Sequence, residues 1–279
     1  MNAPVNPPEL DLALKSLWGA RELPFGAAVV TPYASDPFQQ TRHRLEQLVS
    51  VRACGLLHGP NGVGKTLLVH HFLKALPDKR YKPLVLSHSS VTGTDLLRLL
   101  CLELGQRARM RRSDNVMLIR QGWQQLERLW PVVVLDEAQN LSATALEEVR
   151  LLSCDRRDTQ PPFSLLLVGD EQLLPRLQMG INAPLLARLS FCLHLAPWTG
   201  DELAGYIQAR LQDVGIHANP FEAAALQLLL QAGNGLPRLL NHLAQRALEQ
   251  AAAQNSRAIT TAHVQRALEL LPWVAQLAP

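Results

Sequence analysis

The chain has 279 residues, enough for one large α/β domain or for a large and a small domain. Hydrophobic residues make up 47% and charged residues 18%, which excludes wholesale disorder and allows a sizeable core. The formal net charge is only +3, but 22 of the 27 basic residues are arginine, which suits bidentate phosphate contacts. A GC-rich genome would produce part of the same excess.

The cysteines and the absence of long apolar runs bear on the compartment. Cys54, Cys101, Cys154 and Cys192 lie far apart, without CxxC or metal-ligand spacing, as is typical of a reduced protein. Residues 1–8 lack the features of a signal peptide. No uncharged apolar run reaches the roughly 18 residues that a membrane span needs. The sequence therefore predicts a cytoplasmic protein with no membrane partner.

In chain order, strands and helices alternate up to about residue 196. An N-terminal extension with a short helix over 9–18 is followed by an extended arm over 24–38. Helices are expected at 39–51, 65–76, 94–104, 116–129 and 142–153. Strands are expected at 54–58, 82–87, 131–135, 163–168 and 191–195. This alternation favours a parallel sheet with right-handed crossovers.

From residue 197 onward only helices are expected. Thr199 and Glu202 form a capping box at the start of a helix that extends to about residue 214. Further helices are expected at 220–232, 236–254 and 261–271. We therefore divide the chain into an N-terminal extension (1–23), an α/β nucleotide-binding domain (24–196) and an all-helical lid (197–279).

A phosphate-binding loop follows the first strand. Residues 59–66 fit GxxxxGKT, namely Gly59, Pro60, Asn61, Gly62, Val63, Gly64, Lys65 and Thr66. The glycines let successive backbone N–H groups point at a phosphate. Lys65 would place its charge on the β/γ oxygens of ATP, and Thr66 would offer its hydroxyl to Mg²⁺. The alternative, a chance match in a glycine-rich turn, is disfavoured by the apolar strand before the loop and the apolar-faced helix after it.

An acidic pair ends the β-branched strand at 131–135. In P-loop ATPases, an acidic residue at the place of Asp136 holds Mg²⁺ through water, and a following glutamate such as Glu137 polarises the attacking water. A solvated acidic turn is the alternative. An NKxD-type guanine reader is missing from the sequence, so ATP is favoured over GTP.

Five segments together resemble the AAA+ ATPases: HGPNGVGKT, VVVLDEAQN, LLLVGDEQL, LLARLSF and GNGLPRLLNHL. Within them the chain is similar, over roughly residues 24–271, to the branch of ExeA-type secretion ATPases and the transposition regulators TniB, TnsC and MuB. The resemblance implies the AAA+ fold class, an α/β P-loop parallel-sheet domain followed by an all-helical lid.

The resemblance also assigns roles to further residues. Arg238 matches the sensor 2 arginine, and Arg188 lies where an arginine finger acts on the ATP of a neighbouring subunit; a plain surface arginine is the alternative for each. Asp170 stands where this branch has glutamine, which puts the sensor 1 assignment in doubt. Because an anion would repel the γ-phosphate, we expect Asp170 to bind Arg188 or the water shell of the metal. His88 or Ser89 is a candidate partner of Glu137.

The segment from Arg98 to Arg128 contains seven arginines and only three acidic residues. In DNA-binding members of this branch, the corresponding helices line the central pore of the ring. Candidate contacts to the phosphates of duplex DNA are Arg107, Arg109, Arg111, Arg112 and Arg120. A solvated loop is the alternative.

The resemblance implies an ATPase that forms rings or helical filaments on duplex DNA and regulates transposition with a transposase or target-selection protein. An ExeA-like secretion or assembly ATPase with protein partners, or a non-hydrolysing nucleotide switch, remains open.

Overall fold

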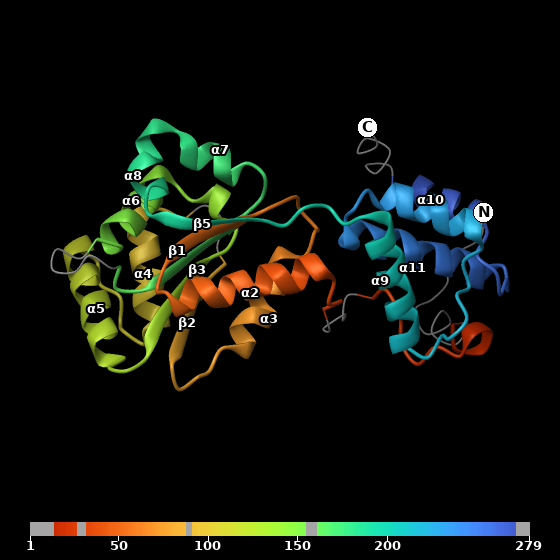
Figure 1. Cartoon of the computed structure of the whole chain (residues 1–279), viewed down its shortest axis with the longest axis horizontal. Helices are drawn as coiled ribbons and strands as arrows, with labels where there is room; N and C mark the ends of the chain where they lie inside the picture. Colours follow the sequence, from red (N-terminus) through yellow and green to blue (C-terminus); the bar gives the residue numbers. More distant parts are fainter. Residues whose placement is uncertain (1–13, 27–31, 88–90, 155–160, 272–279) are drawn as a thin grey trace. The chain divides into compact units, whose positions relative to one another are not determined.

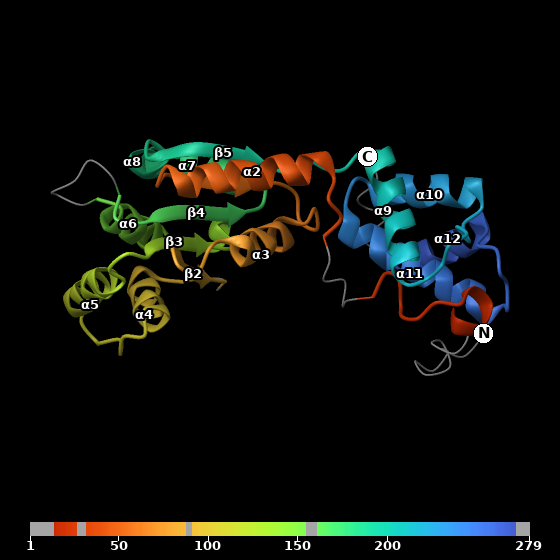
Figure 2. The same cartoon turned by 60° about the horizontal axis from the view of Figure 1, so that its bottom comes forward.

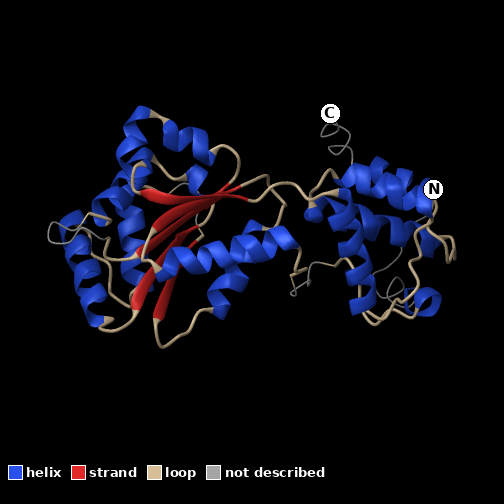
Figure 3. Cartoon of the chain, in the orientation of Figure 1, coloured by secondary structure: helices blue, strands red, loops and turns tan. Residues whose placement is uncertain are grey.

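The computed structural model describes residues 14–26, 32–87, 91–154 and 161–271. The chain divides into two compact units. The sheet unit consists of Asp36–Pro60 and Lys65–Leu195, and the helical unit consists of Met1–Ser35, Asn61–Gly64 and Ala196–Pro279. Figure 1 shows the course of the chain by colour, and Figure 3 shows that the strands drawn form one sheet.

The sheet unit is built on five parallel strands in the order β2-β3-β4-β1-β5. Their bounds are β1 Cys54–His58, β2 Tyr81–Leu86, β3 Trp130–Leu135, β4 Ser164–Gly169 and β5 Leu189–His194. Because all strands are parallel, their carboxyl ends share one edge, where His58 pairs with both Gly169 and His194. This edge carries the segments that were expected to bind nucleotide.

Helices cover both faces of the sheet (Figure 2). The bounds are α2 Asp36–Ser50, α3 Lys65–Ala75, α4 Gly93–Glu103, α5 Arg112–Gln125, α6 Ala143–Leu152, α7 Leu173–Gln178 and α8 Ala183–Leu186, with 3-10 turns at Ala138–Asn140 and Gly180–Asn182. One face of the sheet, with Leu56 and Val133, forms a continuous core with α4 and α6 to α8. On the other face α2 approaches β1 so closely that a Cβ on Gly55 would lie 2.6 Å from Leu48.

The helical unit has its own hydrophobic core. Its helices are residues 14–18, α9 Gly200–Asp213, α10 Ala223–Gly233, α11 Pro237–Ala253 and α12 Thr261–Glu269. The predicted capping box is present, since the Thr199 hydroxyl accepts from the backbone of Glu202 and the Glu202 carboxylate accepts from the backbone of Thr199. Phe25, which we assigned to the α/β domain, lies in the core of the helical unit.

The fold class is confirmed, an α/β P-loop AAA+ fold with an all-helical C-terminal part. Most predicted bounds differ from the observed ones by one to four residues, and two of these differences have local reasons. Helix α2 begins at Asp36 because Pro37 is tolerated in a first helical turn. Helix α5 begins at Arg112, four residues before the predicted start, and buried Asn115 in its first turn exchanges hydrogen bonds with the backbone of Arg109. Among the described residues, no helix is long and apolar enough to cross a membrane.

Candidate nucleotide site

The P-loop links β1 to α3 in a conformation that requires glycine. A Cβ on Gly59 would lie 2.3 Å from the carbonyl oxygen of Leu195, a backbone atom that cannot easily move away. Gly64 has φ +109°, a region that residues with a side chain rarely adopt. The glycines therefore shape the loop that leads into α3, and the N-terminus of a helix is a place where proteins bind anions.

Lys65 is the buried cation of this loop, and the residue is only 7% exposed. Its Nζ donates hydrogen bonds to the carbonyl oxygens of Gly59 at 2.7 Å and Pro60 at 3.0 Å. Burial lowers the pKa of Lys65, and four nearby carboxylates act in the opposite direction: Glu137, Asp170, Asp136 and Glu171. The lysine is thus the positive centre of an otherwise acidic edge of the sheet.

Thr66 and Asp136 meet as the sequence predicted. The Thr66 hydroxyl donates to Oδ2 of Asp136 over 3.0 Å, although 70 residues separate the two in the chain. A hydroxyl and a carboxylate oxygen are hard donors of the kind that Mg²⁺ prefers. These two residues therefore fit Mg²⁺, the ion that the fold family implies, and they would hold it beside Lys65.

Glu137 follows Asp136 in the left-handed region, with φ 54° and ψ 37°. Such a conformation is unfavourable for a non-glycine residue and is often found at functional sites. Its N–H donates to Oδ1 of Asp136 at 2.9 Å, and its exposed carboxylate accepts from Nε2 of Gln139 at 2.7 Å. The two adjacent acidic side chains therefore have different partners, Thr66 for Asp136 and Gln139 for Glu137.

Gln139 is a site residue that the sequence reasoning missed. While its Nε2 donates to Glu137, its Oε1 accepts from the backbone N–H of Asp170 at 3.3 Å. A Cβ on Gly169 would lie 2.6 Å from that Oε1, so the small residue at the end of β4 makes room for the contact. Gln139 thus connects the ends of β3 and β4. Its place three residues after Asp136, in VVVLDEAQN, is the only sequence clue to this role.

Asp170 and Arg188 lie at opposite ends of the parallel strands, so the structure does not bring them together within one chain; the water shell of the metal, the other expected partner of Asp170, remains a prediction. Asp170 follows the carboxyl end of β4, and its Oδ1 accepts from the N–H of Gln172 at 2.9 Å. Arg188 precedes β5, whose first residue pairs with Cys54 at the amino end of β1. The six residues of β5 separate the backbone of Arg188 from the carboxyl end of the sheet by about 20 Å.

Arg238 is the second residue of α11 in the helical unit, and it is exposed. Its backbone N–H donates to the carbonyl oxygen of Gly62 at 3.2 Å, and residues 61–64 group with the same unit. The proposed sensor 2 role of its side chain remains a prediction. His88 and Ser89 lie outside the described residues.

The basic segment before β3 is held by a buried asparagine. Asn115 is fully buried, and its side chain accepts from the N–H of Arg109 at 2.7 Å and donates to the carbonyl of Arg109 at 3.0 Å. Within the part of the chain that the structure describes, four of the predicted DNA contacts have exposed side chains without a hydrogen bond or ion pair: Arg107, Arg109, Arg111 and Arg120. This segment therefore presents unneutralised positive charge.

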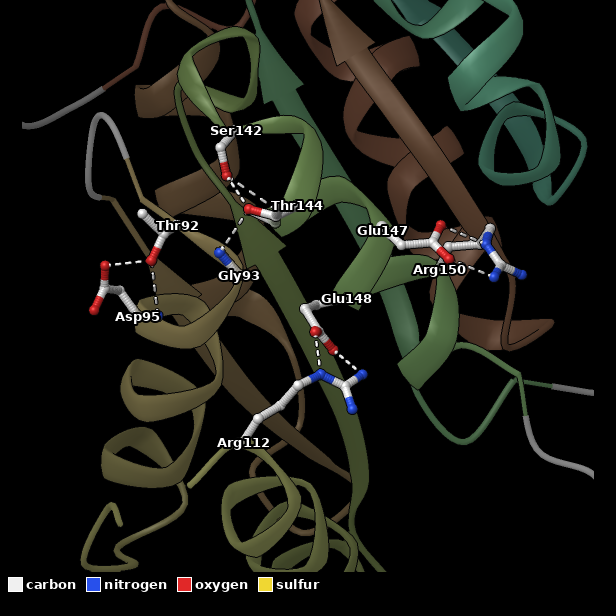
Figure 4. Close-up of polar contacts among 10 residues, drawn as sticks. Thr92, Gly93, Asp95, Arg112, Ser142, Thr144, Glu147, Glu148 and Arg150 are labelled. Carbon is white, nitrogen blue, oxygen red and sulfur yellow. Dashed lines mark hydrogen bonds and ion pairs between the residues drawn. The ribbon is translucent and has the colours of Figure 1, made fainter. Parts of the chain in front are cut away.

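Arg112 differs from its neighbours (Figure 4). Its Nε and terminal nitrogen donate to the two carboxylate oxygens of Glu148, at 2.5 and 2.8 Å. Glu148 lies on α6 and is only 9% exposed, so this bidentate pair joins α5 to α6. The hydrogen bond that Arg112 donates to Glu148 raises the pKa of Arg112. Arg112 is thus committed to an internal ion pair, and the prediction that it contacts DNA loses its support.

The sheet order and the Lys65, Thr66 and Asp136 contacts define the sheet unit as a P-loop AAA+ fold. Residues 47–177 match the family model described as AAA domain. The chain is 30% identical to general secretion pathway protein A of Aeromonas hydrophila over 208 residues, 73% of this chain and 38% of that protein. It thus spans about two fifths of the length of that relative.

Two solved structures resemble the whole fold. The Aeropyrum pernix ORC2 protein in its ADPNP–ADP complexes has a TM-score of 0.67 at 19% identity, over 88% of this chain and 70% of that chain. The Aeropyrum pernix ORC1 protein in complex with DNA has a TM-score of 0.68 at 15% identity, over 89% of this chain and 68% of that chain. At these identities the likeness shows the fold alone.

Proposed function

We propose that this chain binds ATP with Mg²⁺, hydrolyses it between subunits, and uses the cycle to assemble on and leave duplex DNA. The observation that carries the proposal is the meeting of Lys65, Thr66 and Asp136 at one edge of the sheet. Mg²⁺ bound there would neutralise charge on the phosphates. The P-loop N–H groups and Lys65 would bind the β- and γ-phosphates, releasing Lys65 from the carbonyl groups of Gly59 and Pro60.

Glu137 is the proposed general base. Its carboxylate would accept a proton from the attacking water, and the Gln139 amide would hold that carboxylate in place until substrate is bound. Asp170 is poorly suited to be a sensor for the γ-phosphate, because it carries the same sign of charge. We propose instead that it supports the hydration of the metal.

The place of Arg188 supports a proposal that the chain oligomerises. At about 20 Å from the carboxyl end of the sheet, this arginine is too distant to touch the γ-phosphate bound by the same chain. We propose that it completes the site of a neighbouring subunit, and that Arg238 contributes from the lid. ATP then favours the ring or filament, and loss of the γ-phosphate favours its release.

DNA binding is proposed from the four exposed arginines near α5, whose contacts to phosphates would be independent of sequence. The solved relative from Aeropyrum pernix, which is described in complex with DNA, supports this direction. Transposition, with a transposase or target-selection protein as partner, is our narrower proposal. The free cysteines are compatible with action in the cytoplasm.

A second candidate is an assembly ATPase that acts on protein partners. The 30% identity to general secretion pathway protein A favours it. A third candidate, a nucleotide switch that does not hydrolyse, is suggested by Asp170. These three candidates predict different behaviour toward DNA and different consequences of replacing Glu137.

The experiment is electron microscopy and sedimentation of the chain with duplex DNA and a non-hydrolysable ATP analogue, with ADP as control. ATP-dependent rings or filaments on DNA would support the proposal, and assembly without DNA would favour the protein-partner candidate. Glu137→Gln is measured in parallel for ATP turnover. We expect Glu137→Gln to lower the rate of ATP turnover by on the order of 100-fold or more and to retain ATP binding. If neither the unaltered chain nor the variant hydrolyses ATP, and both assemble in the same way with each nucleotide, the nucleotide switch would be favoured.

A further inference from the structure

Two histidines and a glutamate meet at the carboxyl edge of the sheet, outside the residues that we assign to ATP. His58 ends β1, His194 ends β5, and Glu171 follows β4. Nδ1 of His58 lies 3.3 Å from one carboxylate oxygen of Glu171, and Nε2 of His194 lies 2.9 Å from the other. Hydrolysis of ATP requires none of the three.

The geometry is that of a metal site. One ligand atom from each residue lies within 4.8 Å of the other two. Tetrahedral Zn²⁺ with bonds of about 2.0 Å separates its ligand atoms by roughly 3.3 Å, so small rotations suffice to reach it. The centroids of the two imidazole rings lie 4.7 Å apart and the ring planes make an angle of 31°. Both rings already lie beside the carboxylate. Two imidazoles and one carboxylate are a ligand set that zinc uses in proteins when the fourth position is left to water.

The backbone holds the two histidines in place without a metal. His58 and His194 are paired in the parallel ladder of β1 and β5, and Leu195 donates its N–H to the carbonyl of His58 at 2.9 Å. The side chain of His58 is 10% exposed, whereas those of His194 and Glu171 are 46% and 52% exposed. An ion would therefore enter from solvent and keep one side open.

We propose that His58, Glu171 and His194 form a binding site for a single Zn²⁺ ion. Because His58 directly precedes Gly59, the ion would fix the chain at the entrance of the P-loop. It would also fix the end of β5, two residues before the chain enters the helical unit at Ala196. The site is distinct from the Mg²⁺ position at Thr66 and Asp136, which offers only oxygen donors.

The alternative is an ordinary pair of hydrogen bonds from two histidines to a carboxylate. To distinguish them, the full chain without nucleotide is titrated with ZnCl₂ against a chromophoric chelator. His194→Ala and Glu171→Gln remove exposed ligands; His58 is left unchanged because it is buried. Cys192→Ser is the matched control for an exposed thiol on the same strand, and His70→Ala is the control for an exposed histidine elsewhere in the unit.

We expect the unaltered chain and both controls to bind one equivalent, and both ligand variants to bind roughly tenfold or more weakly. Saturating Zn²⁺ is expected to raise the Tm of the unaltered chain but not that of His194→Ala, and the Tm without metal shows that the variants are folded. Failure of the unaltered chain to bind one equivalent, or equal affinity in either ligand variant, would overturn the proposal. Loss of binding in Cys192→Ser with retention in His194→Ala would assign the ion to the thiol and overturn it as well.

Discussion

The side-chain amide of Gln139 donates a hydrogen bond of 2.7 Å to the carboxylate of Glu137. The same amide group accepts from the backbone of Asp170, so the proposed base is tied to the end of the neighbouring strand. We expect Gln139→Ala to lower ATP turnover by on the order of ten- to 100-fold, because the base would lose its position. ATP affinity is expected to stay the same.

The measurement is steady-state ATP hydrolysis together with fluorescent-nucleotide binding. Gln124→Ala, an exposed glutamine on α5, is the control and should behave like the unaltered chain. Equal turnover in Gln139→Ala would show that the amide does not position Glu137.

Replacing the unpaired arginines near α5 is expected to weaken DNA binding without changing the stability of the fold. The double variant Arg109→Ala, Arg111→Ala should weaken binding to any duplex alike and reduce the slope of log affinity against log salt by about 2, since two phosphate contacts are lost. Its stability should change by less than about 0.5 kcal/mol. Fluorescence anisotropy at several salt concentrations gives the slope, and an unchanged slope would remove these residues from the DNA interface.

Arg112→Ala is the matched counterpart. It leaves the Glu148 side chain, only 11% exposed, without its ion-pair partner. We expect the free energy of unfolding to fall by about 1–3 kcal/mol. The salt slope of DNA binding should stay that of the unaltered chain. Urea unfolding measures the first quantity, and a stable protein with a reduced slope would return Arg112 to the DNA-binding set.

Gly59→Ala tests the close approach of the P-loop to Leu195. The new Cβ would lie 2.3 Å from a carbonyl oxygen, so the backbone must shift. We expect a loss of about 1–3 kcal/mol in the free energy of unfolding and weaker ATP binding. Gly180→Ala is the control, because a Cβ there meets no atom within 4 Å. Thermal unfolding with and without ATP would detect both effects, and identical behaviour of the two variants would contradict the argument.

The cysteines should differ in reactivity. Burial raises the pKa of the Cys54 thiol to about 11, although the charge of Arg188 acts in the opposite direction. Below that pH the thiol stays neutral and unreactive, so alkylation at pH 8 should spare Cys54 and modify exposed Cys192. Mass spectrometry identifies the alkylated sites, and the Cys192→Ser variant should lose the rapid alkylation. Rapid modification of folded Cys54 would show that β1 opens.

The contact between Thr66 and Asp136 was predictable from the sequence, because the carboxyl ends of parallel strands share an edge. Two apolar strands, each followed by a polar motif, were enough to bring residues together that lie 70 positions apart. The same rule placed Asp170 at that edge. Local patterns also predicted the Thr199–Glu202 capping box, which depends on only four consecutive residues.

Contacts that depend on the direction of a side chain were not predictable. Arg112 looks like its arginine neighbours in the sequence, and only the packing of α5 on α6 brings it to Glu148. The sequence shows no metal-ligand spacing for His58, Glu171 and His194, because they lie at or just after the ends of three different strands. Their proximity depends on the position of β1 between β4 and β5, which the sequence does not reveal. Asp170 and Arg188 do not meet within one chain because Asp170 follows the carboxyl end of β4, whereas Arg188 precedes the amino end of β5.

The position of Arg188 ahead of β5 has a kinetic consequence. If its guanidinium serves only the ATP of an adjacent copy, an isolated chain holds its nucleotide but turns it over slowly. The specific activity would then rise with protein concentration and fall on dilution. Crowding of subunits on a template, rather than the arrival of a separate activator, would start the reaction.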